Sequence, residues 1–159
     1  DSWTDEAATT TTHQNDTEIR VRSSSAGDRH VWTGFALPAV PARCELTQAR
    51  LRYYNMDPDG GRNIDVYRGD PGAPLWTAAT IAWSNEPAYL GPAATNAATT
   101  NTPGWQEWVV TDHVLAQYAG GNNGFVLRDR TETSPTAYEQ VYYDRQHATY
   151  TPTLVLTWG

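Results

Sequence analysis

The clearest structural pattern in the chain is Leu46-Thr47-Gln48-Ala49-Arg50-Leu51-Arg52-Tyr53-Tyr54. In this segment Ala49, Leu51 and Tyr53 alternate with polar or charged residues, and an alternation of period two is the signature of a half-buried β-strand. Successive side chains of a strand point to opposite faces. The apolar set therefore predicts a face turned toward a core, and the two arginines predict a face turned outward.

The same period recurs on both sides of this segment. It predicts further strands at Ile19–Arg22, Val31–Phe35, Ile64–Arg68, Trp105–Val110, Phe125–Arg128, Glu139–Tyr143 and Pro152–Trp158. Turn-forming residues separate these strands. Many short strands with regular turns indicate an all-β fold, a jelly-roll-like β-sandwich with one short helix.

The helix is expected at Thr111–Ala119. Thr111 or Asp112 would cap it, its inner face would carry Val114, Leu115 and Tyr118, and Gly120-Gly121 would end it. The segment Leu90–Pro103 is rich in Ala, Thr and Asn and is predicted to be a surface loop.

Length and composition limit the class of protein. A chain of 159 residues suits a single domain, residues 1–159, with one core. No apolar run could span a bilayer, so we expect no membrane insertion. The aromatic-rich, weakly charged composition is typical of extracellular β modules, so we expect a secreted domain that is joined to further domains of a longer protein.

The charge of the chain limits the classes of partner that it can bind. A formal net charge of −7 argues against nucleic acid, which needs a basic surface. All basic side chains are arginine; codon bias in a GC-rich genome accounts for this, and arginine forks also suit bidentate contact with carboxylates. The single Cys44 excludes an intrachain disulfide, and its parity with Leu46 predicts a buried, unreactive thiol.

Four groups of segments occur in an order that resembles the DNRLRE family, extracellular β-sandwich domains related to carbohydrate-binding modules. They are Phe35–Pro38 with Ala49–Tyr53; Thr80–Ala88; Trp105–Val114 with Asn122–Arg128; and Tyr143–Arg145 with Pro152–Thr157. The resemblance implies the same fold. It also implies core positions for Phe35, Trp83, Trp105 and Phe125.

Function is less uniform among the proteins that the chain resembles. Some members accompany polysaccharide-degrading enzymes and bind acidic glycans, whereas others lie in large surface or toxin proteins. The chain departs from the family pattern at Val109, where an aspartate is usual, and at Gln146, where a glutamate is usual. The usual Asn-Tyr-Gly turn is missing around Gln14–Thr17.

Two arginine pairs are candidate ligand contacts. Arg20 and Arg22, like Arg50 and Arg52, are two residues apart, so each pair shares one face of its strand. If the two strands were neighbours, four guanidinium groups would line one surface. Their partners would be internal carboxylates such as Glu18, Glu45 or Asp65, which is the first expectation in an acidic protein, or uronate groups of a ligand.

Three aromatic residues lie on the outward parity of their strands: Trp32, Tyr54 and Tyr67. An exposed flat ring can stack on the C–H face of a sugar, so these residues are the candidate stacking positions. For Trp32 an alternative stays open, in which a loop such as Leu90–Pro103 covers the ring.

Metal and catalytic signals are weak. The turn Asp57–Asp65 has oxygen donors at alternate positions, as calcium loops do, but it lacks their distal glutamate and suits a plain hairpin. One structural calcium ion elsewhere is an expectation without a location, and no other cofactor is expected. His13, His30, His113 and His147 stand alone in the sequence, without HExxH or Gly-x-Ser-x-Gly motifs. A carboxylate pair such as Glu139 and Asp144 is a pattern that any acidic protein offers, so no catalytic residue is predicted.

These patterns favour a non-catalytic carbohydrate-binding module that recognises a polysaccharide or a cell-surface glycan. An acidic, uronate-containing polysaccharide is the finer hypothesis. The alternative is a structural or adhesion spacer domain of a large secreted surface or toxin protein.

Overall fold

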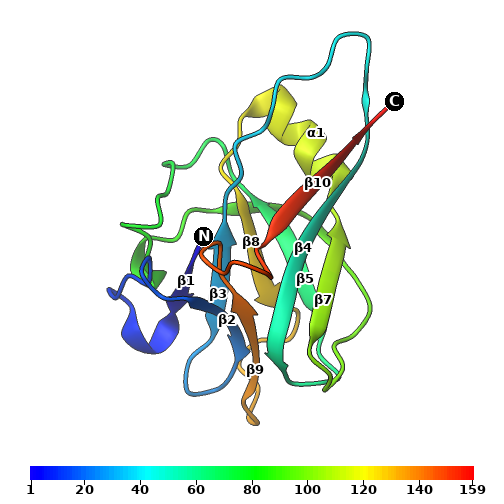
Figure 1. Cartoon of the computed structure of the whole chain (residues 1–159). Helices are drawn as coiled ribbons and strands as arrows, with labels where there is room; N and C mark the ends of the chain where they lie inside the picture. The colour runs from blue at the N-terminus through cyan, green and yellow to red at the C-terminus, as the bar shows by residue number, and fades with distance from the viewer.

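The computed structural model describes residues 1–159 and contains ten antiparallel strands with one α-helix (Figure 1). The strands are β1 (Ser2–Asp5), β2 (Glu18–Ser23), β3 (Arg29–Thr33), β4 (Leu46–Pro58), β5 (Ile64–Gly69), β6 (Tyr89–Ala94), β7 (Gly104–Val109), β8 (Phe125–Asp129), β9 (Tyr138–Tyr143) and β10 (Thr153–Trp158). Helix α1 spans Thr111–Gly120, and short 3-10 helices lie at Glu6–Ala8 and Trp83–Asn85. The predicted all-β fold with one short helix is confirmed.

All strands belong to one sheet that curls on itself, in the order β10-β4-β9-β2-β3-β8-β5-β6. Strand β7 pairs with β4, and β1 pairs with β3. Strand β4 organises one side of the molecule, because β10 and β9 follow each other along one of its edges while β7 occupies the other. The residues of β9, β4 and β7 that point outward are therefore neighbours.

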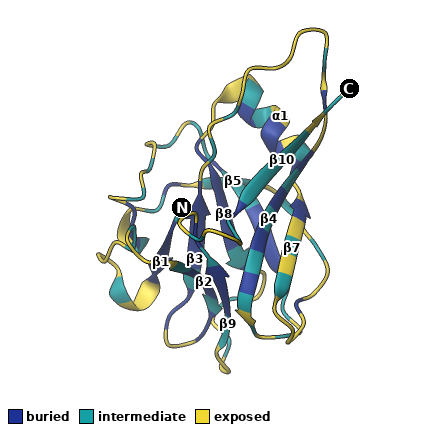
Figure 2. Cartoon of the chain, in the orientation of Figure 1, coloured by how far each residue is buried: buried dark blue, intermediate teal, exposed yellow.

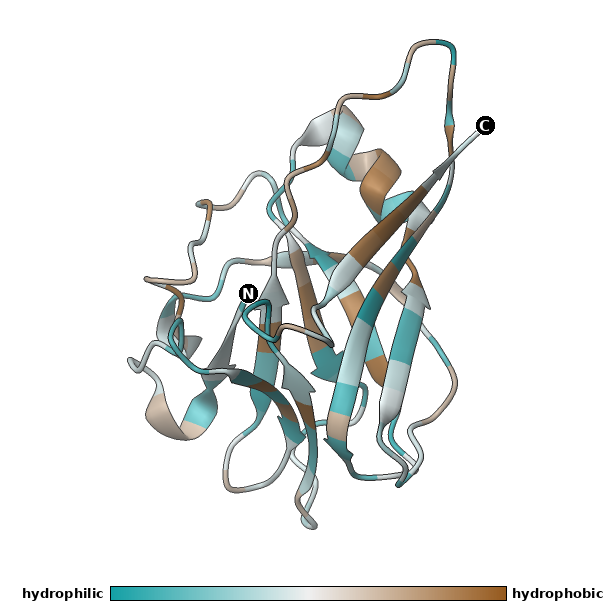
Figure 3. Ribbon diagram, viewed as in Figure 1, coloured by the Kyte–Doolittle hydropathy of each residue, from teal (hydrophilic) through white to brown (hydrophobic).

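The curled sheet encloses one core of sixteen buried residues. On β4, Ala49, Leu51 and Tyr53 are fully buried, as the period-two pattern predicts. Figure 3 shows the hydrophobic and hydrophilic positions alternating along this strand. Trp108 of β7 closes the core by donating its indole N–H to the carbonyl oxygen of Ile64 in β5, at 2.7 Å. Buried positions concentrate on the strands, and exposed ones on the loops (Figure 2).

A second, smaller apolar cluster lies on the outer surface of β3 and β8, where Trp32 and Val126 pack with Ile81. Ile81 belongs to the cover segment, residues 70–88, which joins β5 to β6 and lies at the left of Figure 1. Trp76 from the same segment lies edge-on to Trp32, with 5.9 Å between ring centroids. The outer surface of these strands is therefore a packed layer.

Several local expectations were wrong. Strands β1 and β6 were not predicted, and β6 occupies the first part of the supposed loop Leu90–Pro103. In α1, Leu115 is 45% exposed, and the hydroxyl of Thr111 accepts a hydrogen bond from the Ala49 N–H instead of capping the helix. Cys44 is half-buried. No helix of the structure has the length and apolar character needed to cross a membrane.

Candidate functional site

The four predicted arginines do not gather in one cluster, because β9 separates β2 from β4. Arg20 forms ion pairs with Glu18 at 2.9 Å and with Glu139 at 2.7 Å. Arg22 donates to the carbonyl oxygen of Gly27 at 2.8 Å. The arginines of β2 thus have internal partners, as expected for an acidic protein, and the hypothesis of a single four-arginine surface is wrong.

Two of the three predicted stacking residues lie in the packed layer. Trp32 is fully buried, and its indole N–H donates to Glu86 at 3.0 Å. Tyr67 is half-buried, with its ring centroid 5.1 Å from that of Tyr89. Trp32 therefore cannot stack on a sugar. The alternative of a covered ring is correct, but the cover comes from the cover segment and Tyr89 and not from the expected loop Leu90–Pro103.

The third predicted stacking residue, Tyr54, belongs to a row of rings on the outer surface of three adjacent strands. Tyr143 of β9, Tyr54 of β4 and Trp105 of β7 lie side by side, with centroids 6.0 Å and 5.6 Å apart along the row. Tyr150, from the loop between β9 and β10, stacks on Tyr54 at 3.9 Å. We call these four residues the aromatic platform. Burial raises the pKa of Tyr54, and the neighbouring Tyr150 and Tyr143 raise it further.

Trp105 is the only aromatic side chain of the protein in the exposed class, at 38%. The family resemblance implies a core position for Trp105, and this prediction is wrong. Trp105 and Trp108 are three residues apart on one strand, so they must point to opposite faces, and Trp108 occupies the core. This spacing was the signal that could have identified Trp105 as an outward residue.

Charged side chains flank the exposed indole. The guanidinium carbon of Arg52 lies 4.5 Å from the centroid of the Trp105 ring. Arg52 and Arg50 both form ion pairs with Glu107, and the pair between Arg50 and Glu107 is 3.4 Å long. Two arginines share one carboxylate, so this part of an otherwise acidic molecule carries a local positive charge.

A polar groove of about 270 Å³ runs beside Trp105. One wall is formed by residues of β4 and β7, and the other by the loop between β6 and β7. The lining is mainly amides and hydroxyls, from Asn55, Asn96, Thr99, Thr100, Thr102 and Gln106 together with Pro58, Ala97, Ala98, Gly104, Trp105 and Glu107. The site thus combines an exposed ring, a cationic flank and a row of hydrogen-bonding groups.

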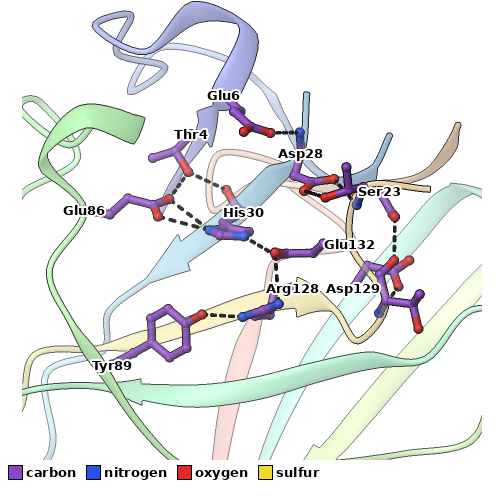
Figure 4. A network of polar contacts seen from close by, with 12 residues as sticks. Thr4, Glu6, Ser23, Asp28, His30, Glu86, Tyr89, Arg128, Asp129 and Glu132 are labelled. Atoms are coloured by element: carbon purple, nitrogen blue, oxygen red, sulfur yellow. Dashed lines mark hydrogen bonds and ion pairs between the residues drawn. The ribbon is translucent and has the colours of Figure 1, made fainter. Parts of the chain in front are cut away.

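A second polar constellation is buried under the cover segment (Figure 4). His30 of β3 lies between Glu132, at 2.6 Å from its Nε2, and Glu86, at 3.1 Å from its Nδ1. Burial alone would lower the pKa of His30, but hydrogen bonds to Glu132 and Glu86 outweigh it and raise the pKa to about 9. Burial likewise opposes the charge on Glu86, yet His30, Thr4 and Trp32 hold its pKa below the ordinary value.

This network joins four parts of the chain. Glu86 accepts from Thr4 of β1 and belongs to the cover segment, whereas Glu132 also pairs with Arg128 of β8 at 2.9 Å. His30 is 4% exposed. The constellation therefore fastens the cover segment to the sheet. No motif in the sequence signals that His30 has two acidic partners.

No group of three or more His, Cys, Asp or Glu side chains is arranged to hold a metal ion. In the turn Asp57–Asp65, Asp59 accepts from the Glu139 N–H, and Asp65 forms a bidentate pair with Arg130. The carboxylates of Asp59 and Asp65 are thus engaged within the protein, and the turn does not fit a calcium loop.

Comparison with protein families identifies the family of the chain. The family described as carbohydrate-binding module family 96 matches residues 1–158, almost the whole chain. No curated protein matches the sequence.

Proposed function

Because the chain belongs to carbohydrate-binding module family 96, we propose that the aromatic platform and the polar groove beside it form its carbohydrate site. The observation that carries this assignment is the position of Trp105. Its exposed indole is the meeting point of the platform, the cationic flank and the groove.

Each part of the site offers a contact that a sugar chain uses. The Trp105 ring would stack on the C–H face of one sugar, a contact worth about 1 kcal/mol. The amides and hydroxyls of the groove, such as Asn96, Thr100 and Gln106, would bind the hydroxyl groups of the next sugars. An open surface groove of this kind suits a polysaccharide chain.

The finer proposal is an acidic, uronate-containing polysaccharide. Arg50 and Arg52 are one-third exposed, and their single shared carboxylate on Glu107 leaves donor capacity for a ligand. Arginine forks bind carboxylates bidentately. Binding carried by exposed charges would weaken with added salt, because salt screens them.

We propose further that the chain binds its glycan without cleaving it, in a secreted protein that joins it to other domains. A relation to DNRLRE domains and a structural calcium ion remain predictions. Incubation with a bound polysaccharide tests the first point, since the number of reducing ends should not increase.

Affinity gel electrophoresis tests the site. We expect retardation of the wild-type chain in gels that contain a polyuronate such as polygalacturonate, and a loss of about tenfold in affinity for Trp105→Ala. Val109→Ala is the matched control, because Val109 lies on the same strand and outer surface and is 58% exposed.

The outcomes are distinct. Retention on neutral glucan or mannan alone would leave the site in place and overturn the acidic ligand. Equal loss in both variants would move binding away from Trp105. No retention on any polysaccharide would favour the structural or adhesion domain.

A further inference from the structure

The aromatic platform is built partly by a loop. Residues 144–152, which we call the strap, connect β9 to β10 and lie across the outer surface of β9 and β4. Two strap residues stack on two strand residues: Tyr150 on Tyr54 and His147 on Tyr143, each with centroids 3.9 Å apart. The position of Tyr150 in the platform therefore depends on the conformation of the strap.

His147 sets that conformation. Its ring Nδ1 accepts the backbone N–H of Tyr150 at 2.9 Å and that of Thr149 at 3.2 Å. Its own N–H donates to the carbonyl oxygen of Asp144 at 3.2 Å, and its carbonyl accepts the Thr151 hydroxyl at 2.5 Å. His147 is thus the centre of the turn that presents Tyr150.

The two hydrogen bonds that Nδ1 of His147 accepts require a neutral ring. A histidine ring nitrogen accepts a hydrogen bond only when it carries no proton, and both nitrogens are donors in the charged ring. Protonation of His147 would place an N–H at Nδ1, where it would face the backbone N–H groups of Thr149 and Tyr150. The two attractive contacts would then become repulsive. The turn cannot keep its geometry in that state.

No ion pair stabilises a positive charge on the His147 ring. The groups that face it are the phenols of Tyr143 and Tyr150, with Tyr54 beneath Tyr150. Glu18, the β2 neighbour of Tyr143, pairs with Arg20. On the strap itself, Asp144 accepts from the Gln146 N–H, and Arg145 points to Asp1 at 4.0 Å.

We propose that His147 is a positioning residue which makes the carbohydrate site sensitive to pH: its neutral ring holds Tyr150 on Tyr54, and its protonation releases Tyr150 from the platform. The proposal rests on the function assigned above. Histidine is the side chain that changes charge between pH 5 and 8. The site is therefore assembled at neutral pH and loosened in mildly acidic surroundings.

The ligand-free protein gives the first test. We expect NMR contacts between the Tyr54 and Tyr150 rings at pH 7.5 and their loss at pH 5, together with shifts of the Thr149 and Tyr150 amides over the same range. His147→Asn should keep the ring contacts at both pH values. An asparagine oxygen can accept backbone N–H groups two and three residues ahead, and it does not titrate.

The binding test uses polygalacturonate as the probe. The wild type should bind at least fivefold more weakly at pH 5 than at pH 7.5, while the ratio for His147→Asn should be near one. His13→Asn is the matched control, because His13 pairs with Asp16 outside the platform, and it should keep the wild-type ratio.

Ring contacts that persist at pH 5, or an equal pH ratio in the wild type and His147→Asn, would overturn the proposal. If no polysaccharide binds at any pH while the ring contacts still depend on His147, the proposed function fails and the strap mechanism stands.

Discussion

Glu107 limits the charge that the site can offer to a ligand. It is the shared partner of Arg50 and Arg52, and all three side chains are about one-third exposed. An exposed ion pair is worth only about 0.2–1 kcal/mol. An incoming uronate can therefore compete with Glu107 for the same guanidinium groups.

From this competition we predict that Glu107→Gln binds polygalacturonate about 2- to 5-fold more tightly than the wild type, the equivalent of one weak exposed ion pair. Isothermal titration calorimetry at low and high salt measures the change, and the gain should shrink with salt. Glu45→Gln removes the same charge from an exposed residue elsewhere and should change affinity little. An equal gain in both variants would point to net charge alone.

Two tryptophans show what a strand pattern can and cannot predict about a site. Parity correctly placed Trp32 on the outer surface of its strand, but parity does not report whether another segment covers that surface. The cover comes from Trp76 and Glu86, about fifty residues later in the chain. Trp105, by contrast, was assigned to the core by family resemblance. Its spacing of three residues from Trp108 already required the two side chains to point to opposite faces of the strand.

At the scale of elements, the cover segment has few backbone bonds to the strands beneath it and is held by side chains. His30 is the main polar anchor, because it contacts Glu86 on the segment and Glu132 beyond β8. His30 is attracted to the two carboxylates only while its ring is protonated and positively charged. The attachment therefore depends on pH.

We predict that the stability advantage of the wild type over His30→Gln, measured as free energy of unfolding, falls by about 2 kcal/mol between pH 7 and pH 9.5. The pKa of His30 is about 9 in the folded protein and near 6.5 in the unfolded chain, so its stabilising contribution is complete below pH 6.5 and is lost as pH rises through 9. Urea unfolding of both proteins over this range measures the loss. The difference also removes the opposite contribution of the N-terminal amine, whose pKa burial lowers to about 6 and which stabilises the fold as pH rises toward 8.

His113 provides the control for that experiment. Burial lowers its pKa, so its contribution is present above pH 6.5 and is lost only toward acid. His113→Gln should therefore keep the alkaline slope of the wild type. Buried Tyr53 and Tyr142, whose pKa values burial also raises, affect stability only above about pH 10, where unfolded tyrosines ionise. A difference between the wild type and His30→Gln that stays constant between pH 7 and 9.5 would contradict a charged His30.

Eight strands could be predicted from the sequence because each has an apolar face turned to the core. Strand β1 has four residues, all buried, and hence no alternation to detect. Strand β6 contains Gly91 and Pro92, which usually signal a turn; proline is tolerated there because β6 is the end of the sheet path. The strap was also beyond prediction, because a loop has no period that tells which way Tyr150 points.

At the scale of the whole molecule, the curled sheet must bring its two halves together over one core. Trp108 makes this contact directly: it is fully buried in β7, and its indole donates to the Ile64 carbonyl of β5 on the opposite half. Ile64 is 1% exposed, so removal of the indole would leave its buried carbonyl without this donor. Three residues earlier, Trp105 makes no such contact and faces solvent.

The same substitution at these two positions should therefore separate stability from binding. We predict that Trp108→Phe lowers the free energy of unfolding by about 3 kcal/mol, since it leaves a cavity and an unpaired buried carbonyl, whereas Trp105→Phe changes it by less than about 0.5 kcal/mol. Urea unfolding measures both, and affinity gels at 10 °C should find folded Trp108→Phe still bound. Equal destabilisation by the two substitutions would place Trp105 in the core. Loss of binding by folded Trp108→Phe alone would show that the site depends on the core contact between β7 and β5, and not on the outer surface.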